Sequence, residues 1–140
     1  MRKTMLDGIT NSSVINILGR GLQAANLRHE VISNNVANVN TPNFKKSDVV
    51  FEDLLAKELS TDSNTLKMTR THDNHLPVSV SPELVSPSVQ QDSTTTMRTD
   101  NNNVDIDIEM ATLAKNNIYY NAMAREVGAY LTKIKTVIKG

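Results

Sequence analysis

The sequence predicts a mainly α-helical fold in which long N- and C-terminal helices pack as a coiled-coil-like pair, with a small irregular or β insert between them. Two observations predict this fold. Apolar residues recur at alternating steps of three and four near both ends of the chain, whereas the middle is polar and holds three of the four prolines. A 3.5-residue repeat is typical of a helix that packs along its length against other helices. We therefore expect an N-terminal assembly helix with its following motif in residues 1–45, a partly disordered insert with short strands in 46–103, and a C-terminal assembly helix in 104–140.

Composition limits what the chain can do by itself. Of its 140 residues, 39% are hydrophobic and only 4% are aromatic, with no Trp, so a monomer has a thin core and needs partners for stability. The formal net charge is zero, which argues against nucleic-acid binding because that depends on a basic face. The absence of cysteine excludes a disulfide framework and a thiol nucleophile.

The first helix is expected to begin at a Ser12 or Ser13 cap and to continue to about Val39, because Thr41 precedes a proline and is pushed out of helical geometry. Gly19 and Gly21 lie inside it and weaken it. They indicate either tolerance or close approach of a neighbouring backbone, or else selection for an easily unfolded helix. The predicted seam of this helix is Leu18, Leu22, Ala25, His29, Ile32, Val36 and Val39.

Asparagines crowd the end of the first helix, at positions 34, 35, 38, 40 and 43. Asn tolerates left-handed backbone geometry and bonds to nearby main chain, so it suits a helix terminus and a turn. Five asparagines exceed what one cap requires. They predict a polar packing surface against neighbouring subunits.

The insert carries weaker signals. A short apolar patch over residues 49–55 predicts one or two helical turns. Alternation over 66–70 and 78–80 predicts short strands and a small hairpin, and the evenly spaced prolines 77, 82 and 87 argue against a helix there.

The second helix is expected to begin at an Asp105 or Asp107 cap and to run to Gly140. A second apolar stripe follows Ala111, Ala114, Ile118, Ala122 and Ala129. One partner helix cannot cover both stripes, so several neighbours are predicted. The main seam of this helix is Met110, Leu113, Asn117, Tyr120, Ala124, Val127, Leu131, Ile134 and Ile138.

Polar residues offer little evidence of chemistry. His72 and His75 have a spacing that binds a metal on a helix, but they lie in a proline-flanked stretch that favours a polar turn. The acidic residues that open the second helix are explained by the helix dipole. His29 and Asn117, within the two seams, either fix the register or lie at the edge of a stripe. We expect no catalytic residues, no cofactor and no metal.

Three motifs resemble one family. Residues 33–45 read SNNVANVNTPNFK, which resembles the helix-ending signature of bacterial flagellar rod and hook proteins. Residues 102–116, NNVDIDIEMATLAKN, and residues 71–76, THDNHL, resemble the short proximal-rod branch of that family. The family often has Gly where this chain has Asn43 and Asn101. Because Asn is the next residue after Gly to accept positive φ, both turns are expected to persist.

The resemblance implies a structural, non-enzymatic component of the periplasmic drive shaft, needed for motility. It would be exported unfolded by the flagellar type III apparatus, which agrees with the lack of an apolar signal segment after Met1–Lys3. The implied partners are other rod proteins and itself, the rod-base adaptor FliE, and components of the membrane ring and export gate, with no nucleic acid and no small-molecule substrate. The alternatives are a sister rod protein that shares the N-terminal signature and a soluble coiled-coil adaptor or export chaperone.

The stripes and the signature together define a set of expected interface residues. They are Leu18, Leu22, Ala25, Ile32, Asn35, Val36, Asn38, Val39, Asn40, Thr41, Pro42, Phe44, Met110, Leu113, Tyr120, Val127, Leu131, Ile134 and Ile138.

Overall fold

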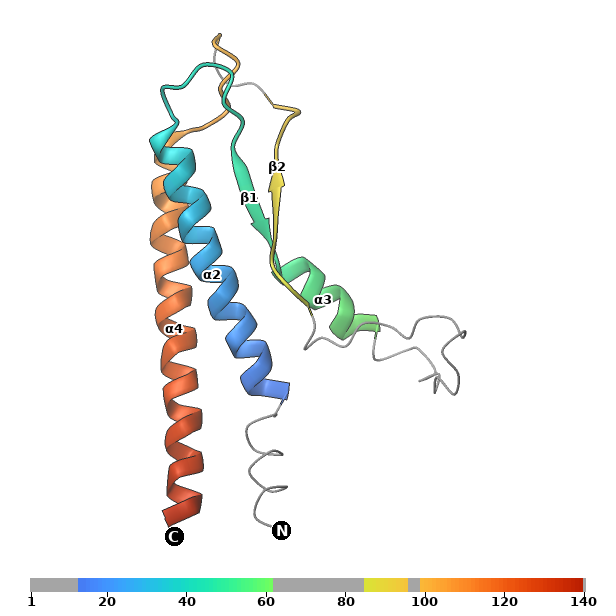
Figure 1. Ribbon diagram of the computed structural model, residues 1–140, viewed down its shortest axis with the longest axis vertical. Helices are drawn as coiled ribbons and strands as arrows, with labels where there is room; N and C mark the ends of the chain where they lie inside the picture. Colours follow the sequence, from blue (N-terminus) through green and yellow to red (C-terminus); the bar gives the residue numbers. More distant parts are fainter. Residues whose placement is uncertain (1–12, 62–84, 96–98, 140) are drawn as a thin grey trace.

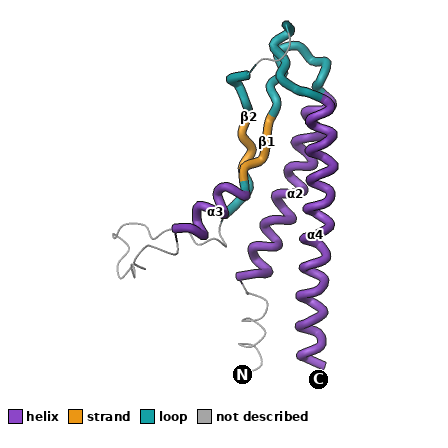
Figure 2. The backbone as a smooth tube through the Cα atoms, turned by 180° about the vertical axis from the view of Figure 1, so that it is seen from behind, coloured by secondary structure: helices purple, strands orange, loops and turns teal. Residues whose placement is uncertain are grey.

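A pair of long helices dominates the computed structural model, which describes residues 13–61, 85–95 and 99–139. The elements in chain order are α2 (Ser13–Ala37), β1 (Ser47–Val50), α3 (Glu52–Thr61), β2 (Ser88–Gln91) and α4 (Ile106–Lys139). Helices α2 and α4 run antiparallel side by side, and β1, β2 and α3 form an arm beside α2 (Figures 1 and 2). The predicted fold class, mainly α with a small β insert, is confirmed.

Small residues allow the two long helices to approach each other. Ala25 on α2 is 1% exposed, with its carbonyl bonded to Asn116 of α4, and Gly21 is also buried. A Cβ atom added at Gly21 would lie 2.6 Å from Sδ of Met123, whereas one added at Gly19 would meet nothing within 4 Å. Close approach of α4 therefore explains Gly21, and no contact explains Gly19.

The helix ends follow local chemistry. The Asp105 carboxylate accepts hydrogen bonds from the backbone amides of Asp107 at 2.9 Å and Ile108 at 3.3 Å, so Asp105 is the predicted N-cap of α4. Helix α2 ends at Ala37, earlier than predicted. The next residues form a tightened turn in which Asn38 N donates to the carbonyls of Asn34 at 3.2 Å and Asn35 at 3.1 Å.

The two strands form an antiparallel sheet in which Val49 lies opposite Val89. The helical prediction for residues 49–55 is therefore wrong in its first half, because Val49 and Val50 belong to β1 and α3 begins only at Glu52. The two adjacent β-branched valines favour an extended chain, and Val49 is buried while Asp48 is exposed. The sheet joins strands from the two ends of the insert. The strands predicted at 66–70 and 78–80 lie outside the described residues.

The apolar core is as thin as the composition predicts. One cluster joins Ala24, Phe51 and Val85, with Leu55 packed against it. Within the described part of the chain, the largest fully buried side chains are Asn35, Asn102 and Asn103, not hydrophobic ones. The fold therefore depends on satisfied polar groups as well as on apolar burial.

A matched pair of glycine substitutions tests the helix contact. Gly19→Ala is expected to stabilise the protein by about 0.5–1 kcal/mol, because alanine has the higher helix propensity and the site is open. Gly21→Ala is expected to stabilise the protein by about 1 kcal/mol less than Gly19→Ala does, because the Met123 side chain must move to make room. Urea unfolding followed by circular dichroism measures both. Equal gains at the two positions would contradict the close approach.

Candidate functional site

Asn35 joins three elements at one end of the helix pair. Its Nδ2 donates to the Ser47 carbonyl at 2.8 Å and to Oε2 of Glu109 at 3.1 Å, while its Oδ1 accepts from Ser47 N at 3.0 Å. The side chain is 1% exposed. A single amide therefore links α2 to β1 and to the first turns of α4.

Asn102, which precedes α4, binds the main chain that follows α2. Its Nδ2 donates to the carbonyls of Asn38, Val39 and Thr41 at 3.0, 3.1 and 2.9 Å, and its Oδ1 accepts from Val104 N at 2.8 Å. These carbonyls lie just beyond α2, where main-chain acceptors need partners. The turn after α2 is thus held by a residue that precedes α4.

Asn103 extends the same arrangement to the strands. Its Oδ1 accepts from Lys46 N at 2.7 Å, and its Nδ2 donates to the Asp92 carbonyl at 2.9 Å and to Oγ1 of Thr95 at 3.0 Å. The hydrogen bonds from Thr95 and Thr94 lower the pKa of the Asp92 carboxyl to about 2. We call Asn35, Asn102 and Asn103 the asparagine clasp.

Two further asparagines shape the turns around the clasp. Asn43 has φ 61° and Asn101 has φ 62°, so the expectation that Asn replaces Gly in positive-φ turns is confirmed. Asn43 N donates to the Asp100 carbonyl at 2.8 Å, and Asn101 Nδ2 donates to Asn43 Oδ1 at 3.2 Å. The two turns therefore contact each other directly.

The clasp corrects one prediction about the asparagine-rich helix end. Asn35 does not face a neighbouring subunit, because its side chain is buried within this chain. Asn38 is half-buried, and its Nδ2 donates to the Asn34 carbonyl at 2.9 Å. Tertiary contacts, which no sequence pattern reveals, turn this polar group inward. Asn40 remains exposed.

The remaining predicted interface residues divide by burial. Ala25 and Ile32 are buried. The half-buried ones are Leu18, Leu22, Val36, Val39, Phe44, Leu113, Val127 and Ile134. The exposed ones are Thr41, Pro42, Met110, Tyr120, Leu131 and Ile138.

The face of α4 that meets α2 is rotated from the predicted seam. Asn116 is buried at 2% exposure, whereas the predicted seam residue Asn117 is exposed. Glu109 is likewise buried and Met110 is 50% exposed. The offset is one residue at both positions, which lie seven residues apart. His29 is exposed, as is Asn117, so both lie at the edge of a stripe.

Helix α4 exposes large apolar side chains on more than one side. Ile118 is 71% exposed, Leu131 54%, Val137 79% and Ile138 62%. The second predicted stripe, Ala111, Ala114, Ile118, Ala122 and Ala129, is exposed along its whole length. Since each residue turns the helix by about 100°, Ile138 lies roughly 160° around the axis from Ile118, so the exposed apolar side chains do not form a single face.

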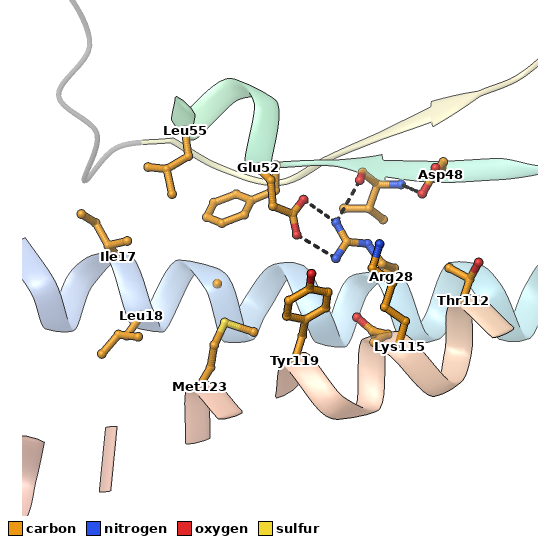
Figure 3. A pocket seen from close by; sticks show the side chains of 14 residues that line it. Ile17, Leu18, Arg28, Asp48, Glu52, Leu55, Thr112, Lys115, Tyr119 and Met123 are labelled. Atoms are coloured by element: carbon orange, nitrogen blue, oxygen red, sulfur yellow. Dashed lines mark hydrogen bonds and ion pairs between the residues drawn. The ribbon is translucent and has the colours of Figure 1, made fainter. Parts of the chain in front are cut away.

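A groove with a volume of about 740 Å³ separates the long helices from the arm (Figure 3). Its walls come from α2, from β1 and α3, and from α4. The lining residues are Ile17, Leu18, Gly21, Arg28, Asp48, Val49, Phe51, Glu52, Leu55, Thr112, Lys115, Asn116, Tyr119 and Met123.

An ion pair closes one wall of this groove. Arg28 donates to both carboxylate oxygens of Glu52, at 2.9 and 2.6 Å, and to the Val49 carbonyl at 3.2 Å. The hydrogen bond to Glu52 raises the pKa of Arg28 despite partial burial. Partial burial would itself raise the pKa of Glu52, but the hydrogen bond and charge of Arg28 outweigh it and hold that pKa below 4.5.

Sequence reasoning missed the residues that organise this region. No sequence motif links Arg28 to Glu52, so their pairing could not be predicted. Asn116 lies next to Asn117, which was assigned to the seam in its place. The pair Asn102-Asn103, just before the cap of α4, was the one available signal.

The described residues also bear on the prediction that the chain has no metal site. In this part of the chain, no three side chains of the metal-ligating types converge. His72 and His75 lie outside it. None of the helices among these residues has the length and apolarity needed to cross a bilayer.

Comparisons with known proteins show which family the chain belongs to. A family model described as flagella basal body rod protein matches residues 15–45. The flagellar basal body rod protein FlgB of Borreliella burgdorferi is 38% identical over 86% of this chain and 91% of its own length. FlgB of Bacillus subtilis is 34% identical over 92% of this chain and 95% of its own. The flagellar hook protein FlgE of Treponema pallidum is 52% identical, but over only 29% of this chain and 9% of its own.

Removing one amide tests the asparagine clasp. In Asn35→Ala, the Ser47 amide and one Glu109 oxygen lose their hydrogen-bond partner. We therefore expect the free energy of unfolding to fall by roughly 1–3 kcal/mol. Asn34→Ala, next to it and exposed, is the matched control and should change this free energy little. Urea denaturation measures both variants. A loss that is the same in both would show that the clasp contributes nothing specific.

The ion pair between Arg28 and Glu52 makes the stability of the fold depend on pH. Because the pKa of folded Glu52 lies below 4.5, the pair stabilises the fold above that pH and loses this contribution as the pH falls through the folded pKa. The difference in Tm between the parent protein and Glu52→Gln should therefore narrow below pH 4.5. Asp53→Asn changes a neighbouring exposed carboxylate and leaves the pair intact, so it is the control. A difference that does not vary between pH 7 and pH 3 would refute the assignment.

Proposed function

Since this chain belongs to the FlgB family of flagellar basal body rod proteins, we propose that it is a proximal component of the periplasmic drive shaft and acts there without enzymatic activity. The family membership itself makes it a structural component of the basal-body rod that assembles with other flagellar rod and hook components. The observation that carries the proposal is the match to FlgB along nearly the whole chain, 38% identical over 86% of it. The FlgB relatives favour this branch over the sister rod protein FlgC.

The proposed assembly surface consists of the exposed large apolar side chains of α4 together with the exposed end of the Asn-Thr-Pro motif. These side chains include Leu131 and Ile138, and Thr41 and Pro42 lie at the opposite end of the helix pair. A surface of large apolar residues on a chain with a thin core favours assembly over a free monomeric existence. The contacts include further copies of this chain, the adaptor FliE, and components of the membrane ring and export gate.

The route to the rod is part of the proposal. We infer export through the flagellar type III apparatus without a cleavable signal. The small apolar cluster around Phe51 supports it, because a chain with few buried apolar contacts unfolds at low cost. A soluble adaptor or export chaperone would stay in the cytoplasm, so the location of the protein separates the two functions.

Complementation of a gene deletion tests the proposal. The deletion should remove the rod from basal bodies and abolish swimming, and the wild-type gene should restore both. Leu131→Asp should fail to restore them although the isolated protein stays soluble, because the exposed Leu131 side chain contributes little to the monomer. Ser93→Asp, a polar and exposed position on the arm, is the control and should support swimming. Intact basal bodies in the deletion strain would contradict the proposed function.

A further inference from the structure

Charges of opposite sign lie on the two sides of the groove. The arm carries the exposed carboxylates of Asp48 and Glu52, and α4 carries the exposed Lys115 (Figure 3). Helix α2 lies between the arm and α4, with Arg28 bonded to Glu52 as described above. Among the described residues, neither Asp48 nor Lys115 forms an ion pair. The charges of the groove are therefore complementary to each other across it.

The charge of Lys115 acts on the arm across the groove. Partial burial raises the pKa of Glu52, the hydrogen bond and charge of Arg28 lower it more, and the charge of Lys115 adds a smaller lowering. The Lys115 ammonium is held loosely, with Nζ 5.8 Å from the ring centroid of the exposed Tyr119. Since an ionised carboxylate has about four acceptor sites, Glu52 can accept from Lys115 without releasing Arg28.

The arm is anchored firmly at one end only. At that end the asparagine clasp binds Ser47, the first residue of β1, through two hydrogen bonds with Asn35. Farther along the arm, its packing on α2 includes a small apolar cluster that joins Ala24 to Phe51 and Val85. Beyond this cluster, α3 projects away from the helix pair (Figures 1 and 2). A segment fixed at one end and held by a small contact beyond it can turn about the fixed end.

We propose that the arm has a second, closed position, in which it turns about the clasp until Asp48 and Glu52 meet Lys115 of α4. The structure shows the open position, and the ion pair between Arg28 and Glu52 is kept in both. On closure the apolar lining of the arm approaches Met123 of α4, which removes apolar surface from water. In the closed position the chain itself covers the groove, so the groove is accessible to another molecule only when the arm is open.

Spin labels on the arm and on α4 test the closed position in the purified full chain, which has no natural cysteine. Ala56→Cys on α3 and Ala122→Cys on α4 change exposed positions, so the labels spare the core. Double electron–electron resonance should give two distances between these labels, the shorter one from the closed position. Lys115→Glu should remove the shorter distance because it places like charges on the two sides of the groove. Lys115→Arg keeps the charge and should keep the shorter distance.

A second pair of labels shows whether the long helices stay in place. Asn26→Cys with Ala122→Cys joins exposed positions on α2 and α4, and this distance should be the same in the parent protein and in both Lys115 variants. A change in it would mean that the helix pair moves instead of the arm, which would overturn the inference. An arm-to-α4 distance distribution that is the same in the parent protein and in Lys115→Glu would overturn it as well, as would loss of the shorter distance in Lys115→Arg. The isolated chain is used throughout, so the result does not depend on the proposed function.

Discussion

The fold depends on buried side-chain amides at the junction of the two long helices. Asn102 holds the carbonyls that follow α2, and Asn35 ties α2 to β1 and Glu109. Asn103 ties the approach to α4 to Lys46 and Asp92, which flank the two strands. Each neutral hydrogen bond raises the free energy of unfolding by only about 0.5–1.5 kcal/mol. A buried polar group that lacks its partner lowers that free energy by more. The clasp is therefore favourable only when it is complete. This makes the start of α4 and the end of α2 order together.

The clasp also determines which surfaces remain free. It fixes the helices antiparallel at one end, and the contact then depends on the small residues Gly21 and Ala25. On α4 the matching face uses Glu109 and Asn116, both polar. Most of the large apolar side chains of α4 are thereby left outside the intramolecular contact. A monomer that buries Ala25, Asn35 and Asn116 while exposing Ile118 and Val137 leaves large apolar surface in contact with water, which is unfavourable.

Sequence reasoning succeeded where local chemistry decides the structure. The repeat located both helices, a carboxylate before an apolar run located the Asp105 cap, and substitution of Gly by Asn predicted positive φ at Asn43 and Asn101. It failed where distant segments decide. The four-residue strands β1 and β2 pair across most of the insert, and the exposed Ser and Gln side chains of β2 leave no alternation to detect. Asn35 was predicted to face outward because polarity by itself says nothing about tertiary partners.

The offset between the predicted and observed seams on α4 has a physical meaning. A heptad that served only the contact with α2 would centre on the buried residues Glu109 and Asn116. The apolar repeat instead passes through Met110, Leu131 and Ile138, which are about half-exposed or more. Since large apolar residues at regular spacing are typical of a helix seam, the exposed members of this repeat support the proposed contact with neighbouring chains. The polar clasp thus anchors the start of α4 while large apolar side chains of this helix stay exposed, which leaves them available for the proposed assembly.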